Sequence, residues 1–240
     1  MIYVYALTDP GDPPTAVRGL DGATLHVLAV DEAAAVYSEL GGEAPGPSAE
    51  NLWQHEAVAE ALLPGRAVLP VRFGTTLEGA AHLNRLLQRN VHVVVAGLDR
   101  VRGLVEVGVR VVSSDGVGSS EEFKPTGPGS GDTVHTGREY LMHRLAGEQR
   151  RRARREQARR RADAVHQPLA ALAQAADLRT LRQGDVLVGA YLVAPTDVDV
   201  LVARARELDD ANPDLQVICT GPWPAHSFVP DLDLEGAAHS

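Results

Sequence analysis

The sequence lacks several features that would place it outside the cytoplasm. It has one cysteine, Cys219, so no disulfide can form within the chain, which fits a reducing compartment. No apolar run approaches the ~20 residues that a membrane-spanning helix needs. The first residues, MIYVYALTDP, lack the basic start of a secretory signal and predict a strand instead. We therefore expect a cytoplasmic protein that does not span a membrane.

The sequence also lacks the usual patterns of catalytic and metal sites. His55-Glu56 begins like the helix of a zinc protease, but Ala59 stands where the second histidine would have to lie. A zinc site on such a helix needs both imidazoles one turn apart. No Gly-x-Ser-x-Gly element is present either. The sequence therefore predicts no catalytic residue, no metal ligand and no cofactor, and we do not expect an enzyme.

Charge is present in quantity and is distributed unevenly. The formal net charge is −9, yet residues 150–161 hold eight arginines and one glutamate, a local charge of +7. The remaining 228 residues must therefore carry −16. An acidic body with one basic segment predicts contacts between surfaces of opposite charge, within the molecule or with a partner.

The first hundred residues predict strands alternating with helices. We expect strands at residues 2–7, 24–30 and 67–71, and a helix from Ser48, a suitable N-cap, to Leu63. Thr75-Thr76-Leu77-Glu78 matches a capping box and predicts the start of a second long helix. Residues 91–95 are rich in β-branched side chains, but apolar residues from 80 to 101 recur at helical spacing, which favours a helix to about residue 100.

The second half predicts a different small unit. Residues 104–112 alternate as a strand, residues 113–134 are rich in Gly, Ser and Pro and predict an exposed loop, and a long helix is expected from about 136 to 176. Strands are expected at 178–182, 184–193 and 215–220, with a helix at 196–208 between the last two. This order suits a ferredoxin-like unit, an antiparallel sheet with helices on one face.

The predicted fold class is therefore α+β with two small domains. The expected boundaries are 1–100 for the N-terminal domain, 101–222 for the ferredoxin-like domain and 223–240 for a Pro-rich and acidic tail. The long Arg-rich helix belongs to the second domain. Its arginines favour a solvated face, although an acidic protein surface or the phosphates of a nucleic acid could also bind them. Arg151, Arg155 and Arg159 are the residues we select as a possible electrostatic patch.

Four ordered segments resemble the GvpF/GvpL family of gas vesicle proteins. They are Tyr-Val-Tyr-Ala-Leu at 3–7, Leu-Pro-Val-Arg-Phe-Gly-Thr at 69–75, Gly-Leu-Val-Glu-Val-Gly-Val-Arg at 103–110 and Gly-Pro-Trp-Pro-Ala-His-Ser-Phe-Val at 221–229. Residues 137–141 also fit. The match departs at Ala225-His226, where the family pattern has Pro-Tyr.

The resemblance implies an accessory protein for forming gas vesicles, located in the cytoplasm and at the vesicle. It implies contact with the small hydrophobic shell protein GvpA and with other accessory proteins, and no nucleic acid or membrane partner. Two other classes stay open from the residues alone: a small-molecule enzyme with a site between the domains, and a nucleic-acid-binding module using the Arg-rich helix.

The two most specific segments supply the residues that could contact a partner: Arg72, Phe73, Gly74, Trp223, Pro224 and Phe228. Each segment also has a structural interpretation. Arg72 could pair with a carboxylate at a structural junction between strand and helix. Trp223, held by its flanking prolines, is expected to be buried and to fix the tail to the body, with a direct partner contact as the alternative.

Overall fold

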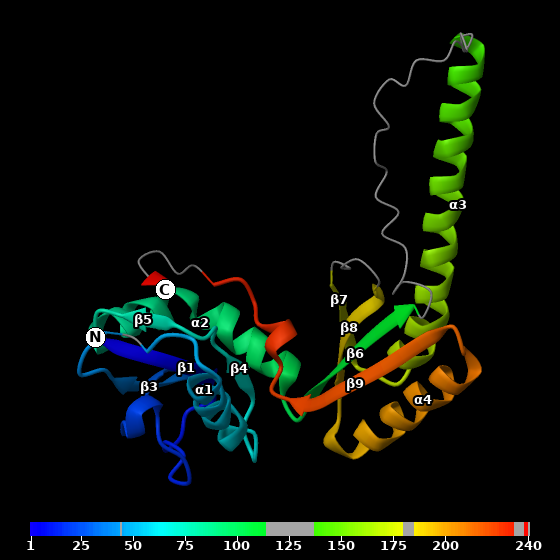
Figure 1. Ribbon diagram of the computed structural model, residues 1–240. Coiled ribbons are helices and arrows are strands. Elements are labelled where there is room, and N and C mark those ends of the chain that lie inside the picture. Colours follow the sequence, from blue (N-terminus) through cyan, green and yellow to red (C-terminus); the bar gives the residue numbers. More distant parts are fainter. Residues whose placement is uncertain (44, 114–136, 180–184, 233–237, 240) are drawn as a thin grey trace.

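The computed structural model describes residues 1–43, 45–113, 137–179, 185–232 and 238–239. The predicted loop 113–134 lies outside these ranges except for its first residue. The described chain is a mixed α/β protein with two antiparallel sheets (Figure 1). The first sheet contains strands from both ends of the sequence, and the second is built from residues 105–223.

The first sheet is organised around β1. Its strands are β1 (Ile2–Thr8), β2 (Leu25–Val30), β3 (Ala33–Glu39), β4 (Val68–Pro70), β5 (Thr75–Leu77) and β10 (Ala238–His239). The order is β10-β5-β1-β3-β2, and β4 also pairs with β1. On one edge of β1, β4 pairs with residues 6–8 and β5 pairs with residues 2–3. The segment 71–74, which connects β4 to β5, therefore leaves this edge and returns to it.

Helices α1 (Ala49–Leu62) and α2 (Ala80–Val101) pack on opposite faces of this sheet. Tyr3 and Tyr5 of β1 belong to the core beneath α1, whereas Ile2 and Val4 belong to the core beneath α2, as the alternation of a strand requires. The expected cap at Ser48 is present. The helical interpretation of residues 91–100 is confirmed, because α2 continues to Val101.

One local prediction for this half is wrong, and one strand was missed. Thr75–Leu77 forms β5, and α2 begins only at Ala80 after Gly79, without a side-chain cap. The free edge of β1 at Ile2 and Tyr3 pairs with this segment, and sheet pairing outweighs the local capping pattern. The strand β3 was not predicted from its sequence, because its three consecutive alanines are weak β-formers.

The second sheet has the order β7-β8-β6-β9 and is antiparallel throughout. Its strands are β6 (Val105–Ser113), β7 (Ala175–Leu178), β8 (Asp185–Val193) and β9 (Leu215–Trp223). Helices α3 (Gly137–Ala170) and α4 (Val198–Ala211) share one core with it. This core includes Val107, Tyr191 and Leu201.

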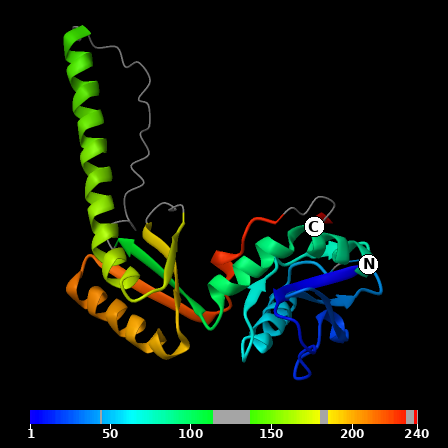
Figure 2. The same cartoon turned by 180° about the vertical axis from the view of Figure 1, so that it is seen from behind.

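Helix α3 extends well beyond the sheet that it packs on (Figures 1 and 2). Its 34 residues span about 50 Å at ~1.5 Å per residue. Val165 and Leu169 near its end are buried in the core of the second sheet. The helix ends at Ala170, two residues after Pro168, and β7 follows at Ala175, so both the expected helix end at 176 and the expected strand at 178–182 lie too late in the sequence.

After β9 the chain returns to the first half of the molecule. A short 3-10 helix, His226–Phe228, follows β9, and residues 229–232 run along α2 toward β10 (Figure 1). We call residues 229–232 together with β10 the tail strap. It closes one edge of the first sheet by pairing with β5.

Candidate functional site

The segment 71–74 forms a loop that departs from the edge of β1 between β4 and β5. The backbone N–H of Val71 still donates to the carbonyl of Tyr5 at 2.9 Å. The Arg72 carbonyl then accepts from the amide of Thr75 at 3.2 Å and from its hydroxyl at 2.8 Å. Gly74 has φ 87°, a left-handed conformation that favours glycine. The loop is therefore a defined turn within the sheet edge.

A hydrogen-bonded circuit holds this loop from the α1 side. The Gly74 amide donates to the Tyr3 hydroxyl at 2.9 Å, and that hydroxyl lies 3.1 Å from Nδ1 of His55. Nε2 of His55 lies 2.9 Å from the Val71 carbonyl. The pattern is complete when Tyr3 donates to Nδ1 and the imidazole donates from Nε2, which fixes the neutral tautomer of His55.

Burial supports the neutral forms of both side chains. His55 is 1% exposed, and its burial lowers the pKa of the imidazole, although the hydrogen bond to Val71 opposes this. Burial also raises the pKa of Tyr3 to about 12. The partial resemblance of His55-Glu56 to a zinc motif thus has a structural explanation: His55 holds the loop between β4 and β5.

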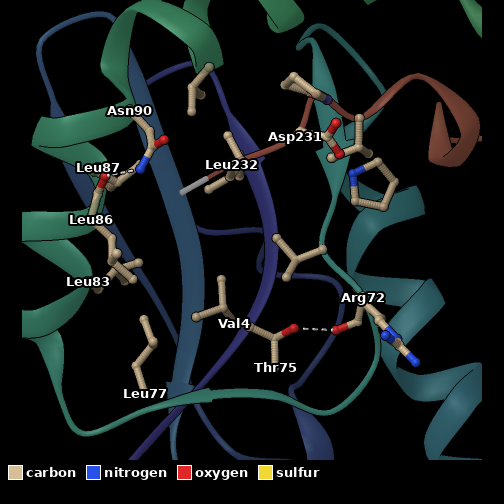
Figure 3. Close-up of a pocket in the computed structure, with 16 residues that line it drawn as sticks. Val4, Arg72, Thr75, Leu77, Leu83, Leu86, Leu87, Asn90, Asp231 and Leu232 are labelled. Atoms are coloured by element: carbon tan, nitrogen blue, oxygen red, sulfur yellow. Dashed lines mark hydrogen bonds between the residues drawn. The ribbon is translucent and has the colours of Figure 1, made fainter. Parts of the chain in front are cut away.

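An apolar pocket lies on the other side of the same loop, between the sheet and α2 (Figure 3). Its volume is about 280 Å³. Strand β1, the segment 70–77, α2 and the tail strap all contribute to its wall: Val4, Leu7, Pro70, Val71, Arg72, Thr75, Leu77, Leu83, Leu86, Leu87, Asn90, Val94, Val229, Pro230, Asp231 and Leu232. Four residues of the segment 69–75 therefore line it.

The three selected residues of this segment have different environments. The side chain of Arg72 is exposed and points away from the pocket (Figure 3), and no ion pair to it is found within the described ranges. The predicted pairing with a carboxylate is therefore not seen. Phe73 is half-buried, with its ring centroid 5.6 Å from that of His55, and Gly74 is buried.

The second segment, 221–229, lies where the two halves meet. Glu106 of β6 is 7% exposed and accepts from both the amide and the hydroxyl of Ser227, each at 2.7 Å. Nε2 of His226 lies 2.9 Å from a carboxylate oxygen of Glu56 on α1. Burial would raise the pKa of Glu56, but the hydrogen bond and charge of His226 hold it below its usual value.

Phe228, and not Trp223, is the deeply buried aromatic residue of this segment. Phe228 is 4% exposed and shares a core with Leu98 of α2 and Leu192 of β8, while the guanidinium of Arg100 lies 5.3 Å from its ring centroid. Trp223 is half-buried at the end of β9, and Pro224 is buried. Phe228 is thus more deeply buried than Trp223, and the anchoring of the tail by Trp223 stays a prediction.

Of the selected arginines, only Arg159 has a described side chain. It is exposed, with Nε 3.8 Å from an oxygen of Asp163. The side chains of Arg151 and Arg155 lie outside the described part of the structure. Near the end of α3, Arg161 makes a 2.7 Å ion pair with Asp214.

Among the described residues, no helix combines the length and the apolar character that a membrane span requires. Among the same residues, no group of three or more histidine, cysteine, aspartate or glutamate side chains could hold a metal ion.

Comparisons with known proteins point to one family. The family model described as "Gas vesicle synthesis protein GvpL/GvpF" matches residues 1–230. The chain is 31% identical to gas vesicle protein L of a Streptomyces species, over 95% of this chain and 92% of that protein. It is 25% identical to gas vesicle protein F2 of Halobacterium salinarum, over 95% and 91% of the two chains.

Solved structures show the same fold. The crystal structure of GvpF from an Anabaena species aligns with a TM-score of 0.74 at 20% identity, covering 96% of both chains. That of GvpF from Microcystis aeruginosa aligns with a TM-score of 0.75 at 17% identity, covering 96% of this chain and 99% of that one. From the match along the sequence and the close relatives, the chain belongs to the GvpL/GvpF family of gas vesicle synthesis proteins.

Proposed function

We propose that this protein binds the hydrophobic gas vesicle shell subunit GvpA, together with other accessory proteins, and assists vesicle assembly in the cytoplasm without catalysing a reaction. Membership of the GvpL/GvpF family supports a role in gas vesicle formation. The physical rationale is that an unassembled shell subunit exposes apolar surface and aggregates unless a partner covers it.

The observation that carries the proposal is the position of the apolar pocket. Pro70, Val71, Arg72 and Thr75, from one of the two most specific family-like segments, line it. The Tyr3–His55 circuit fixes this segment from the opposite side. The loop is thus held rigidly at the rim of an apolar pocket, which suits recognition of an apolar segment and leaves the exposed Arg72 at the rim for a polar contact.

Charge reversal of Arg72 tests this site. Arg72→Glu should leave the melting temperature nearly unchanged, because the side chain is exposed and makes no ion pair with a described residue. Capture of co-expressed GvpA by the purified variant should fall several-fold. Arg18→Glu is the matched control, since Arg18 is exposed elsewhere in the same half. Equal capture by all three proteins would place the binding surface elsewhere.

We also propose the domain boundaries 1–100, 101–222 and 223–240, with a ferredoxin-like second domain. The element order β6-α3-β7-β8-α4-β9 and the sheet order β7-β8-β6-β9 support this proposal, since they combine a βαββαβ chain path with an antiparallel sheet. In this arrangement α3 and α4 are the two crossover helices of the domain, and the first turns of α3 extend beyond the sheet (Figure 1).

The arginine window of α3 is proposed as an electrostatic contact for an acidic partner surface. Reversing Arg151, Arg155 and Arg159 to glutamate should change the melting temperature little, because exposed ion pairs contribute only ~0–1 kcal/mol each. Binding to vesicle partners should weaken at low salt, and the difference should shrink at high salt. The control reverses three exposed arginines of the first half, Arg18, Arg85 and Arg89.

Each outcome of this comparison is informative. If the α3 variant unfolds, its arginines belong to a structural ion-pair network. If it binds as the control does, the window is only a solvated face. Steeply salt-dependent binding of the unaltered protein to DNA, lost in the variant, would favour the nucleic-acid function instead.

A further inference from the structure

Helix α1 presents a large apolar side chain to the solvent. Its inward face, which includes Val58 and Leu62, is buried in the core of the first sheet. On the outer side Trp53 is 69% exposed, and Leu52 beside it is 44% exposed. Tryptophan is among the residues that most often dominate the energy of protein contacts. The helix also contains three glutamates and no lysine or arginine, so its outer face combines an apolar anchor with negative charge.

Helix α3 presents the complementary combination. Leu145 is 52% exposed, and Arg152 is exposed seven residues later, which is about two turns along the same face. By the helical period this face lies opposite Val165 and Leu169, the residues that bury the end of α3 in the second core. The extended turns of α3 point away from the half that contains α1 in both views (Figures 1 and 2), so the two faces do not meet within one molecule.

We propose that the protein self-associates head to tail, with the extended part of α3 of one molecule packed along the outer face of α1 in a second copy. The inference rests on the electrostatic role proposed above for the arginine window of α3, and it identifies the acidic surface as α1 of another copy.

The spacing of the exposed residues fits a parallel alignment of the two helices. On α1, Glu60 is exposed and lies seven residues after Trp53. The spacing from Leu145 to Arg152 on α3 is the same. The two apolar side chains therefore pack together when Glu60 pairs with Arg152. Neither charged residue makes an ion pair within the described ranges, so both are available for this contact.

The size and charge of the contact determine how strong it is. Two or three turns of each helix bury far less than the roughly 1,200 Å² of a small standard interface, so the association should be weak and concentration-dependent. The charge of +7 in residues 150–161 and of −16 in the rest of the chain attract unlike ends of two copies. Because the two faces differ, each copy can bind one neighbour through α3 and another through α1.

Charge reversal on either helix tests the pairing in the full-length protein. Glu60→Arg and Arg152→Glu should each weaken self-association about tenfold at low ionic strength, because attraction between the two positions becomes repulsion. An equimolar mixture of the two variants should restore most of it, because position 60 of one variant and position 152 of the other again carry opposite charges. Sedimentation equilibrium over a range of protein concentrations measures the association. Glu78→Arg and Arg85→Glu are the matched controls, since both side chains are exposed in the first half.

The mixture gives the decisive result. If each variant is weakened and the mixture stays dissociated, positions 60 and 152 do not face each other and the inference is wrong. It is equally wrong if the unaltered protein is monomeric at every concentration, or if the two reversals act no more strongly than their controls.

The fluorescence of Trp53 locates the contact independently. The chain has two tryptophans, and Trp223 is already half-buried. As the concentration of the unaltered protein rises, emission should shift to shorter wavelength because Trp53 becomes covered, and high salt should reverse the shift. Trp53→Ala should abolish the shift and weaken the association while leaving the melting temperature nearly unchanged. Association without a shift would place the contact away from α1 and overturn the inference.

Capture of GvpA separates this inference from the proposed function. A monomeric protein that still captures GvpA would overturn self-association and leave the proposed function intact. Self-association that responds to both reversals, without capture of GvpA, would support the inference and reject the shell subunit as a partner. If the protein is monomeric and Trp53→Ala weakens capture of GvpA, the outer face of α1 binds the shell subunit and not a second copy.

Discussion

Replacing Phe228 with alanine should lower the free energy of unfolding by about 3–5 kcal/mol, the usual loss for a fully buried phenylalanine. Phe228 is 4% exposed and shares a core with residues of both sheets, including Leu69 of β4 and Leu192 of β8. Its removal therefore leaves a cavity where the two halves of the molecule meet. Urea unfolding followed by circular dichroism measures the loss.

Trp223→Ala is the informative comparison for this prediction. Trp223 is the larger ring and lies five residues earlier, but it is only half-buried, so its replacement should cost clearly less than that of Phe228. A larger loss for Trp223→Ala than for Phe228→Ala would mean that Trp223 anchors the segment, as the sequence alone predicts. Val200→Asp, on the exposed side of α4, should leave the unfolding midpoint unchanged and serves as the surface control.

The helices were the most predictable elements of this fold. Apolar residues of α2 recur along one face over 22 residues, and this long stripe outweighs the β-branched content of residues 91–95. Strands were harder to predict where their pairing partners are far away in sequence. β5 forms because the edge of β1, more than 70 residues away, is free to pair.

The candidate site was predictable only in part. The family-like segments drew attention to Arg72, Phe73 and Gly74, and the pocket does lie beside them. Nothing in the sequence shows that His55, from the middle of α1, supports the same loop, because that contact depends on how α1 packs on β1. Only an indirect indication of this contact was available. A histidine on the buried face of a helix needs hydrogen-bond partners, and here Tyr3 and Val71 supply them.

Replacing Tyr3 with phenylalanine should destabilise the protein strongly, although it removes a single oxygen atom. The ring still fills its space, but the Gly74 amide loses its acceptor and Nδ1 of His55 loses its donor. Each buried group left unsatisfied costs about 1–3 kcal/mol. The control is Tyr37→Phe, which changes a half-buried tyrosine on the same sheet. If Tyr3→Phe lowers the free energy of unfolding no more than Tyr37→Phe does, water must satisfy the Gly74 amide and Nδ1 of His55 in place of the Tyr3 hydroxyl.

The circuit should also make stability depend on pH. The folded protein holds the pKa of His55 below its usual value, so the unfolded chain binds this proton more readily. The stabilisation is therefore complete above the unfolded pKa of about 6.5 and is lost as the pH falls from there toward the folded pKa. Urea unfolding between pH 7.5 and 5 should show this decline, and His55→Gln should flatten it in the same range. An equally steep decline in His55→Gln would assign the pH dependence to other groups.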